Sequence, residues 1–268
     1  MKEIVKFIHG SYLYGTNTET SDKDYCSVLI PSVEEILESK IGLTTIEPTH
    51  EICEGKENCD HTRFDIFDFF HRAMRASPTV VEWLFIPKDK IITSCWQWEK
   101  IIEYRDSFLS KRVYQSFLGY SYSEEKAIFL QSPHMGDKRK KQFEQFGYSP
   151  KNAMNCVRLL QQGIELLDTK TITFPRTNSE FLKEIKNGIA NINSIKSLIG
   201  NLRKDLQHSF EDSELPDKSN EKVCKYLCLY LITGYMTYEE LFLSELYHTK
   251  GINFYNLADS KRFLIGLQ

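Results

Sequence analysis

The sequence lacks the features by which membrane and secreted proteins are recognised. No stretch approaches the roughly 20 consecutive apolar residues that a transmembrane helix needs. The opening MKEIVKFIHG is too short and too quickly polar for a secretory signal. Neither an internal repeat nor a low-complexity tract is found along the 268 residues. We therefore expect a cytoplasmic, globular protein that has no membrane partner.

Cysteine pairs in the arrangement of a disulfide scaffold or a zinc site are also missing. The seven cysteines are an odd number in a chain too large to need disulfide staples. Cys224 and Cys228 have no neighbouring His or Cys pair, and Cys53 and Cys59 lack a second pair at zinc-site spacing. We expect reduced thiols and no structural zinc.

An excess of positive charge is absent as well. The formal net charge of −3 excludes a globally basic, histone-like binder, so any contact with nucleic acid must come from local clusters of Lys and Arg. Hydrophobic residues make up 41% and charged residues 26%, as in folded globular proteins. A chain of this length can bury a substantial core, either in one domain or in two.

The hydrophobic pattern changes near Trp98. Before it, short β-like runs alternate with helical ones, whereas helical periodicity dominates afterwards. This predicts an α+β fold: a small mixed sheet flanked by helices in residues 1–98, followed by a mainly helical domain in residues 99–268. Strands are expected at 4–8, 25–30 and about 60–64, and helices at about 66–75, 98–105, 111–130, 150–167, 180–187, 192–212 and 221–247. The polar segments 51–58 and 134–145 are expected to be a loop and a connector.

Two short motifs between the first two strands carry the chemistry. Gly10-Ser11 follows the first strand, and Asp22 and Asp24 stand at the start of the second. Residues two apart on a strand point to the same face, so the two carboxylates converge. Such a pair repels itself unless a hard cation such as Mg²⁺ takes oxygen ligands from both. Gly10 and Ser11 offer backbone N–H groups and a hydroxyl to nucleotide phosphates.

Phosphoryl-type transfer depends mainly on positioning and charge neutralisation, and two metal ions can clamp the attacking and leaving oxygens. A third carboxylate is then required. Asp60, at the start of the third predicted strand, is our choice, because Asp65 has a simpler role as N-cap of the following helix with Asp68 three residues on.

Basic residues further along the chain are candidates for phosphate contact. Lys151, Asn155 and Arg158 fall on one face of a predicted helix, which suits a polar wall against triphosphate or acceptor. The alternative is an ordinary solvated face. The run Lys138, Arg139, Lys140 and Lys141 is a candidate for acceptor phosphates, although a basic loop serves solubility as often.

At these residues the chain resembles the DNA polymerase beta superfamily of nucleotidyltransferases, whose hallmark is G-S, a spacer, and D-x-D. The longer string HGSYLYGTNTETSDKDYCSVLIP is similar to the predicted nucleotidyltransferases assigned to an RNA-repair pathway, and the resemblance runs with gaps from about residue 4 to 225. Lys151 and Arg158 match its basic positions. The chain departs from the family pattern at Ser77-Pro78, where the family has Asn-Pro, and at Asn155, where it usually has His.

The resemblance implies an enzyme of the EC 2.7.7 type that uses Mg²⁺ or Mn²⁺ and transfers a nucleoside monophosphate from an NTP such as ATP, releasing pyrophosphate. Its implied acceptor is an RNA end, for instance on a tRNA. A protein-AMPylating or antibiotic-modifying transferase shares the first motif and stays an alternative. A catalytically inactive nucleotide-binding module is a second alternative, against which the intact Asp22 and Asp24 argue. Oligomeric state and NTP preference are not indicated by the sequence.

Overall fold

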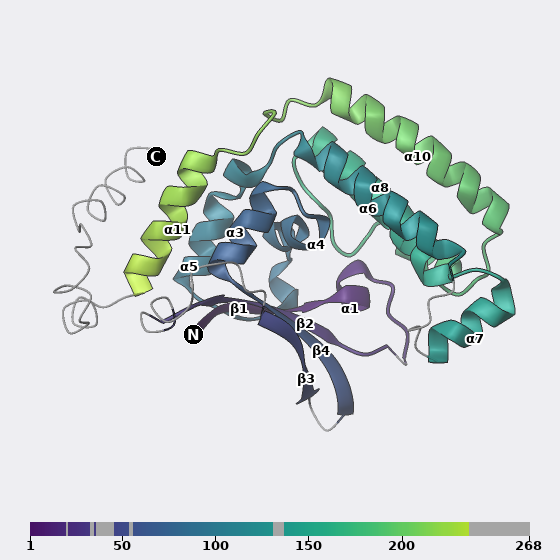
Figure 1. Ribbon diagram of the computed structural model, residues 1–268, viewed down its shortest axis with the longest axis horizontal. Coiled ribbons are helices and arrows are strands. Elements are labelled where there is room, and N and C mark those ends of the chain that lie inside the picture. Colours follow the sequence, from purple (N-terminus) through teal and green to yellow (C-terminus); the bar gives the residue numbers. More distant parts are fainter. Residues whose placement is uncertain (20, 33–34, 36–45, 54–55, 131–136, 236–268) are drawn as a thin grey trace.

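The structure, a computed structural model, describes residues 1–19, 21–32, 35, 46–53, 56–130 and 137–235 (Figure 1). Within these residues a small sheet carries the N-terminal part of the chain, and helices lie to one side of it. This arrangement confirms the predicted α+β class.

The sheet is mixed and five-stranded, with the order β3-β4-β2-β1-β5. β2 and β4 are parallel, and the other neighbouring pairs are antiparallel. The parallel pair places the start of β2 next to β4, and this neighbourhood forms part of the candidate active site described below. The strands are β1 (Lys2–His9), β2 (Asp24–Ile30), β3 (Ile46–Cys53), β4 (Lys56–Asp65) and β5 (Ile91–Ser94).

Among the residues that the structure describes, most helices follow β5, whereas the short helices at 10–14 and 78–81 and the helix at 66–74 are interleaved with the strands. No helix in the described part of the chain combines the length and apolar content needed to cross a bilayer. Short 3-10 turns join several of the helices: η1 (Glu82–Phe85), η2 (Lys88–Lys90) and η3 (Arg105–Phe108). The helices are α1 (Gly10–Tyr14), α3 (Ile66–Met74), α4 (Pro78–Val81), α5 (Trp96–Glu103), α6 (Arg112–Ile128), α7 (Asp137–Phe146), α8 (Pro150–Thr169), α9 (Ser179–Lys186), α10 (Ile192–Asp212) and α11 (Glu221–Tyr235).

Aromatic side chains fill the core between the sheet and the helices. The ring of Phe7 lies 5.1 Å from that of Trp83, and Phe69 lies 5.7 Å from Trp98. All four side chains are buried and belong to one hydrophobic cluster that continues into α8, α10 and α11. The core therefore joins residues on both sides of Trp98, while the division into 1–98 and 99–268 stays a prediction.

Most of the predicted elements are confirmed. The helix predicted at 192–212 has those bounds, and the other predicted helices begin and end within a few residues of the observed ones. For the last of them the structure describes Glu221–Tyr235, so residues 236–247 of the predicted helix lie outside the described residues. Asp65 caps α3 as predicted, because its side chain accepts a hydrogen bond from the backbone N–H of Asp68 at 2.8 Å.

Three elements contradict the sequence-based prediction. Residues 51–58 were expected to be a loop, but 51–53 end β3 and 56–58 begin β4, which pairs with it. β5 was not predicted, since a strand of four residues at a sheet edge leaves almost no periodic signal. The connector predicted at 134–145 is helical from Asp137, because its polar residues include good helix formers.

The cysteines agree only in part with the expectation of reduced thiols. Five of them, Cys26, Cys95, Cys156, Cys224 and Cys228, are free. Cys59 on β4 is disulfide-bonded. The spacing of the cysteines was used only to judge zinc ligation, and it gave no indication of a disulfide at Cys59.

Candidate active site

One cavity of about 300 Å³ gathers most of the residues singled out from the sequence. It lies where α1 and the start of β2 meet the helices α7, α8 and α9. Of the predicted site residues, Arg158, Lys140 and Lys141 are not part of its lining. The lining residues are Gly10, Ser11, Tyr14, Thr16, Ser21, Asp22, Asp24, Asp60, Gln142, Lys151, Met154, Asn155 and Lys186.

Strand register explains why Asp24 and Asp60 come together. β2 and β4 run parallel with Tyr25 opposite His61, so the residues one position earlier, Asp24 and Asp60, are also side by side. Neighbouring strands are about 4.8 Å apart, and residues level with each other point to the same face. Asp24 and Asp60 are thus adjacent carboxylates, and Asp22 follows from the loop that leads into β2.

Gly10 is required because the chain passes very close to Asp24. β1 pairs with β2 so that His9 lies opposite Asp24, which sets Gly10 directly beside the carboxylate. A Cβ atom at Gly10 would overlap Oδ2 of Asp24, and the backbone of Gly10 has φ +62°, a left-handed conformation that favours glycine. The residues between Gly10 and Asp24 therefore form the connection that lets β2 return antiparallel to β1 and brings Asp24 back beside Gly10.

The charges in the cavity act on Asp24. Burial raises the pKa of the Asp24 carboxyl, and the neighbouring carboxylates of Asp60 and Asp22 raise it further, whereas His9 and Lys151 lower it. The ionised form of Asp24 is therefore less stable, relative to the protonated form, than it is for a carboxyl group in water. A cation bound between the carboxylates would remove that disadvantage.

The residues present fit a hard divalent cation by their chemistry. Asp22, Asp24 and Asp60 supply only carboxylate oxygens to one cavity, which are the ligands that Mg²⁺ prefers. Within the described residues, however, no group of three or more His, Cys, Asp or Glu side chains is gathered as a metal-binding cluster.

The helical part of the chain supplies the positive wall of the cavity. Lys151 and Asn155 lie one turn apart on α8 and both line it, whereas Arg158, the third residue of the predicted polar face, does not. Lys186, at the end of α9, also lines it and donates a hydrogen bond to the backbone oxygen of Thr16 at 2.9 Å. Sequence reasoning missed Lys186, because no motif links a single lysine on a distant helix to the loop after β1.

Arg158, predicted to bind nucleotide, lies instead in a buried network around Glu82. Glu82 Oε1 accepts a hydrogen bond from the Tyr14 hydroxyl at 2.8 Å and lies 2.8 Å from His9 Nε2. Its Oε2 accepts from Arg158 Nη1 at 3.4 Å and from Gln162 Nε2 at 3.2 Å. The Arg158 guanidinium also stacks over the Tyr14 ring at 3.9 Å. We call these five residues the Glu82 network.

The Glu82 network is charged although it is buried. Glu82 is 1% exposed and Arg158 7% exposed. Burial alone would raise the pKa of Glu82, but the hydrogen bonds and charges of His9, Arg158 and Tyr14 lower it. Burial likewise opposes protonation of His9, and contacts with Cys26 and Glu82 overcome it and raise the pKa of His9 to about 10. The network therefore holds an ionised carboxylate between two cations.

This arrangement ties the loop after β1 to α8. His9 and Tyr14 flank Gly10-Ser11, Arg158 and Gln162 come from α8, and Glu82 joins them from η1. The distance between the first motif and Lys151 is consequently set by buried ion pairs. The sequence signal for this network is a lone carboxylate within the apolar run Val80-Val81-Glu82-Trp83-Leu84-Phe85, and the prediction from sequence overlooked it.

The remaining predicted residues lie outside the cavity lining. The Asp65 carboxylate caps α3, and burial raises the pKa of that carboxyl. Lys140 and Lys141 are exposed on α7, next to Gln142, which does line the cavity. The side chains of Lys138 and Arg139 lie outside the described residues.

Comparison with known proteins gives three findings. The family model RlaP, described as the RNA repair pathway DNA polymerase beta family, matches residues 4–228. A phage T4 protein named as an uncharacterized 38.9 kDa protein in the nrdC-mobD intergenic region is 30% identical over 124 residues, which cover 45% of this chain and only 37% of that protein. A nucleotidyltransferase-like protein from Exiguobacterium sibiricum aligns over 98% of this chain and 85% of its own, with 10% identity and a TM-score of 0.28, too low to support an inference.

Proposed function

The chain belongs to the RNA repair pathway DNA polymerase beta family, and on that premise we propose that it transfers a nucleoside monophosphate from an NTP to a hydroxyl at an RNA end, such as that of a tRNA. The observation that carries the proposal is the single cavity that holds Asp22, Asp24 and Asp60 beside Gly10, Ser11 and Lys151. Acidic and phosphate-binding groups in one cavity are the two requirements of metal-assisted nucleotidyl transfer.

In this proposal Asp22, Asp24 and Asp60 hold Mg²⁺ or Mn²⁺, which when bound neutralises phosphate charge and favours deprotonation of the acceptor. Gly10 and Ser11 contribute a backbone N–H and a hydroxyl to the β- and γ-phosphates. Lys151 and Lys186 face the same cavity and balance the negative charge of the triphosphate. Lys140 and Lys141, with Lys138 and Arg139, stay the proposed contacts of acceptor phosphates.

The reaction forms one bond and breaks another. The acceptor oxygen attacks the α-phosphorus, the bond between that phosphorus and the bridging oxygen of the β-phosphate breaks, and pyrophosphate leaves with the bonding electron pair. We assign the proton of the attacking hydroxyl to the carboxylate of Asp60, which is the exposed partner of Asp24 on the neighbouring strand. Positioning and charge balance do the rest.

In the proposed mechanism Arg158 does not contact the nucleotide. Its guanidinium is occupied by Glu82, Gln162 and the ring of Tyr14. We therefore propose that it positions Tyr14 and α8, and thereby Lys151, rather than contacting a phosphate.

Label transfer tests the proposed reaction. The protein is incubated with each α-³²P-labelled NTP, Mg²⁺, and either total RNA or total protein. We expect label on RNA and release of pyrophosphate, and neither with an Asp24→Asn variant or after chelation of Mg²⁺. Label on protein instead of RNA would replace the RNA acceptor by a protein acceptor, and no label on any acceptor would contradict the enzymatic proposal.

The third carboxylate is tested by comparing Asp60→Asn with Asp65→Asn. We expect Asp60→Asn to reduce transfer by a factor on the order of 100 to 1,000, because it removes a charged group from the cavity. Asp65→Asn should keep near-normal turnover and lose less than about 1 kcal/mol of stability, since Asn is also a good N-cap. The measurements are initial rates at saturating Mg²⁺ and urea unfolding of both variants.

The opposite result would reassign the two residues. If Asp65→Asn abolished transfer and Asp60→Asn did not, their roles would have to be exchanged. The pairing of β2 with β4 makes the first result the expected one.

A further inference from the structure

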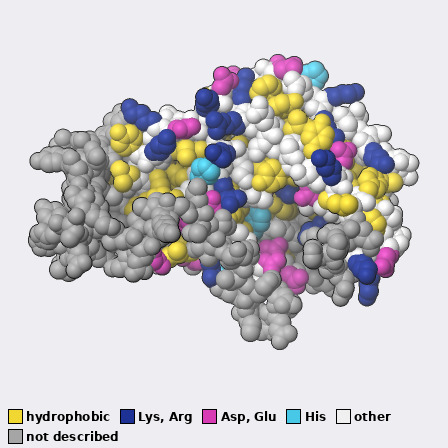
Figure 2. Space-filling view, viewed as in Figure 1, with side chains coloured by type: hydrophobic (Ala, Val, Ile, Leu, Met, Phe, Trp, Pro, Cys, Tyr) yellow, Lys and Arg dark blue, Asp and Glu magenta, His cyan; other side chains and the backbone are white. Residues whose placement is uncertain are grey.

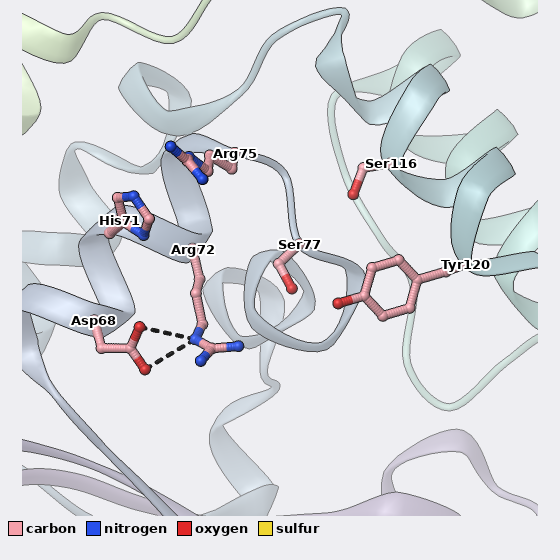
Figure 3. Close-up of a pocket in the computed structure, with 7 residues that line it drawn as sticks. All are labelled: Asp68, His71, Arg72, Arg75, Ser77, Ser116 and Tyr120. Carbon is pink, nitrogen blue, oxygen red and sulfur yellow. Dashed lines mark hydrogen bonds and ion pairs between the residues drawn. The ribbon is translucent and has the colours of Figure 1, made fainter. Parts of the chain in front are cut away.

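A second cavity, of about 390 Å³, opens between α3 and α6 (Figure 3). Figure 3 shows Arg72 and Ser77 on one side and Ser116 and Tyr120 of α6 on the other, with His71 and Arg75 farther out along the α3 side. Figure 2 shows Lys and Arg side chains gathered over this part of the surface. We call it the arginine pocket, and its lining residues are Asp68, His71, Arg72, Arg75, Ser77, Ser116 and Tyr120.

The basic side of the arginine pocket comes from one face of α3. His71, Arg72 and Arg75 follow one another at helical spacing, so all three reach the same cavity. Arg72 is held in place, because its Nε donates to both carboxylate oxygens of Asp68, at 2.9 and 2.8 Å, and its guanidinium lies 5.0 Å from the centre of the Phe64 ring. The position of this positive charge is therefore fixed by the helix and the sheet beneath it.

The turn after α3 directs the next polar group to the pocket. Ala76 has φ +55°, a left-handed conformation that is unfavourable for a residue with a Cβ atom. Backbone hydrogen bonds from Ala76 N–H to Ala73 O at 2.9 Å and from Ser77 N–H to Arg72 O at 3.0 Å hold the turn closed. Ser77 consequently lies beside Arg72 instead of continuing along the helix (Figure 3).

The opposite side of the pocket offers hydroxyls and an aromatic ring. Ser116 and Tyr120 lie one turn apart on α6, and Tyr120 is 43% exposed. In the described part of the chain, the side chains of His71, Arg75, Ser116 and Tyr120 take part in no hydrogen bond or ion pair. A single exposed arginine needs no explanation. The one carboxylate in the lining, Asp68, is ion-paired with Arg72, so Arg75 is the arginine whose charge it does not hold. An arginine, a histidine, hydroxyls and an exposed ring around one cavity form a set suited to a ligand that has both phosphates and bases.

We propose that the arginine pocket binds the backbone of the single-stranded RNA acceptor, with Arg75 on a phosphate and Tyr120 stacked on a base. The proposal rests on the proposed function. Arg72 lies over Phe64, which follows Asp60 by four residues on β4, a separation of roughly 13 Å along the strand at about 3.3 Å per residue. The triphosphate group by itself does not span that separation, whereas an RNA strand whose end lies in the active site does.

Direct RNA binding tests the proposal independently of catalysis. Fluorescence anisotropy would measure the Kd of a labelled single-stranded RNA of about 12 nucleotides for the whole chain at several salt concentrations. Arg75→Ala should raise Kd about tenfold and lower the slope of log K against log salt by about 0.7, the value for one lost phosphate contact on a single strand. Tyr120→Ala should raise Kd about tenfold without changing that slope, and Tyr120→Phe should retain wild-type binding.

Controls separate the pocket from other sources of binding. Lys204→Ala on α10 removes the same charge from an exposed position away from both cavities and should leave Kd unchanged. ATP affinity, measured by calorimetry, should be the same in Arg75→Ala as in the wild type, which distinguishes an RNA site from a second nucleotide site. An Arg75→Ala variant with wild-type Kd and salt slope, or a wild-type protein that does not bind the RNA, would overturn the proposal. Failure of the proposed function would look different: RNA bound through the pocket, but no label transferred to it.

Discussion

An Asp24→Asn variant is expected to lose nucleotidyl transfer by a factor on the order of 1,000 while folding normally. Asp24 is the carboxylate that Gly10, Asp22, Asp60 and Lys151 all approach. Asparagine keeps its shape but cannot supply a negative charge to a cation. Initial rates with labelled NTP measure the loss. Asp205→Asn, which removes an exposed carboxylate on α10, is the matched control and should retain activity.

The same variant should change how stability responds to pH and to Mg²⁺. The pKa of Asp24 is raised in the folded protein, so the folded state binds a proton more readily than the unfolded chain does. Wild-type stability should accordingly rise as pH falls through the raised pKa of Asp24, and Asp24→Asn should lack that rise. Mg²⁺ should stabilise the wild type against heat and have less effect on the variant. A wild-type level of transfer, or equal stabilisation by Mg²⁺, would contradict the assignment of Asp24.

A Glu82→Gln variant is expected to lose about 3–5 kcal/mol of the free energy of unfolding, because two buried cations would remain without their carboxylate. His9 and Arg158 are both held against Glu82 in the interior. Activity should fall in parallel, since the network sets the loop after β1 against α8. Urea unfolding gives the loss. Glu214→Gln, at an exposed surface ion pair with Lys170, should cost well under about 1 kcal/mol.

The pH dependence of the Glu82→Gln loss follows from His9. In the wild type the pKa of His9 is raised from 6.5 to about 10, so its protonation stabilises the fold fully below pH 6.5 and the contribution disappears as pH rises through about 10. In Glu82→Gln the contacts with Cys26 remain but the contribution of Glu82 is lost, so the pKa of His9 should be lower than in the wild type. The difference between the two proteins should therefore be greatest below pH 6.5 and shrink toward pH 10, without vanishing, because Arg158 stays charged. A loss independent of pH would exclude His9 from the network's electrostatics.

Much of the fold could be predicted from the sequence, because capping residues and apolar spacing favour the same elements that the tertiary structure contains. The cap at Asp65 is a local hydrogen bond, and the long amphipathic helices carry enough turns for their apolar spacing to be plain. The edge strands were missed for the opposite reason. β3 contains Pro48 and charged residues, and it exists by pairing with β4 rather than by its own composition.

Only those parts of the site whose residues are close together in the sequence could be predicted from it. Gly10, Ser11, Asp22 and Asp24 lie within one loop, and the register of β2 with β4 then brings Asp60 to them. The placement of Arg158 was not readable, because a basic residue on a helix face looks the same whether it meets a phosphate or a buried carboxylate. Only the position of Glu82 in space decides between the two.

The contacts between η1 and α8 determine when, during synthesis, the cavity can be completed. Glu82 is separated in the chain by 76 residues from Arg158 and by 80 from Gln162. Contacts of such separation form late, and a chain emerging from the ribosome folds from its N-terminal side. The nascent chain therefore carries all three carboxylates well before Lys151, Arg158 and Lys186 are available. Until α8 and α9 dock, the acidic residues lack the lysines that line the cavity with them. If the proposed function holds, we expect no nucleotidyl transfer by nascent chains that end before residue 186.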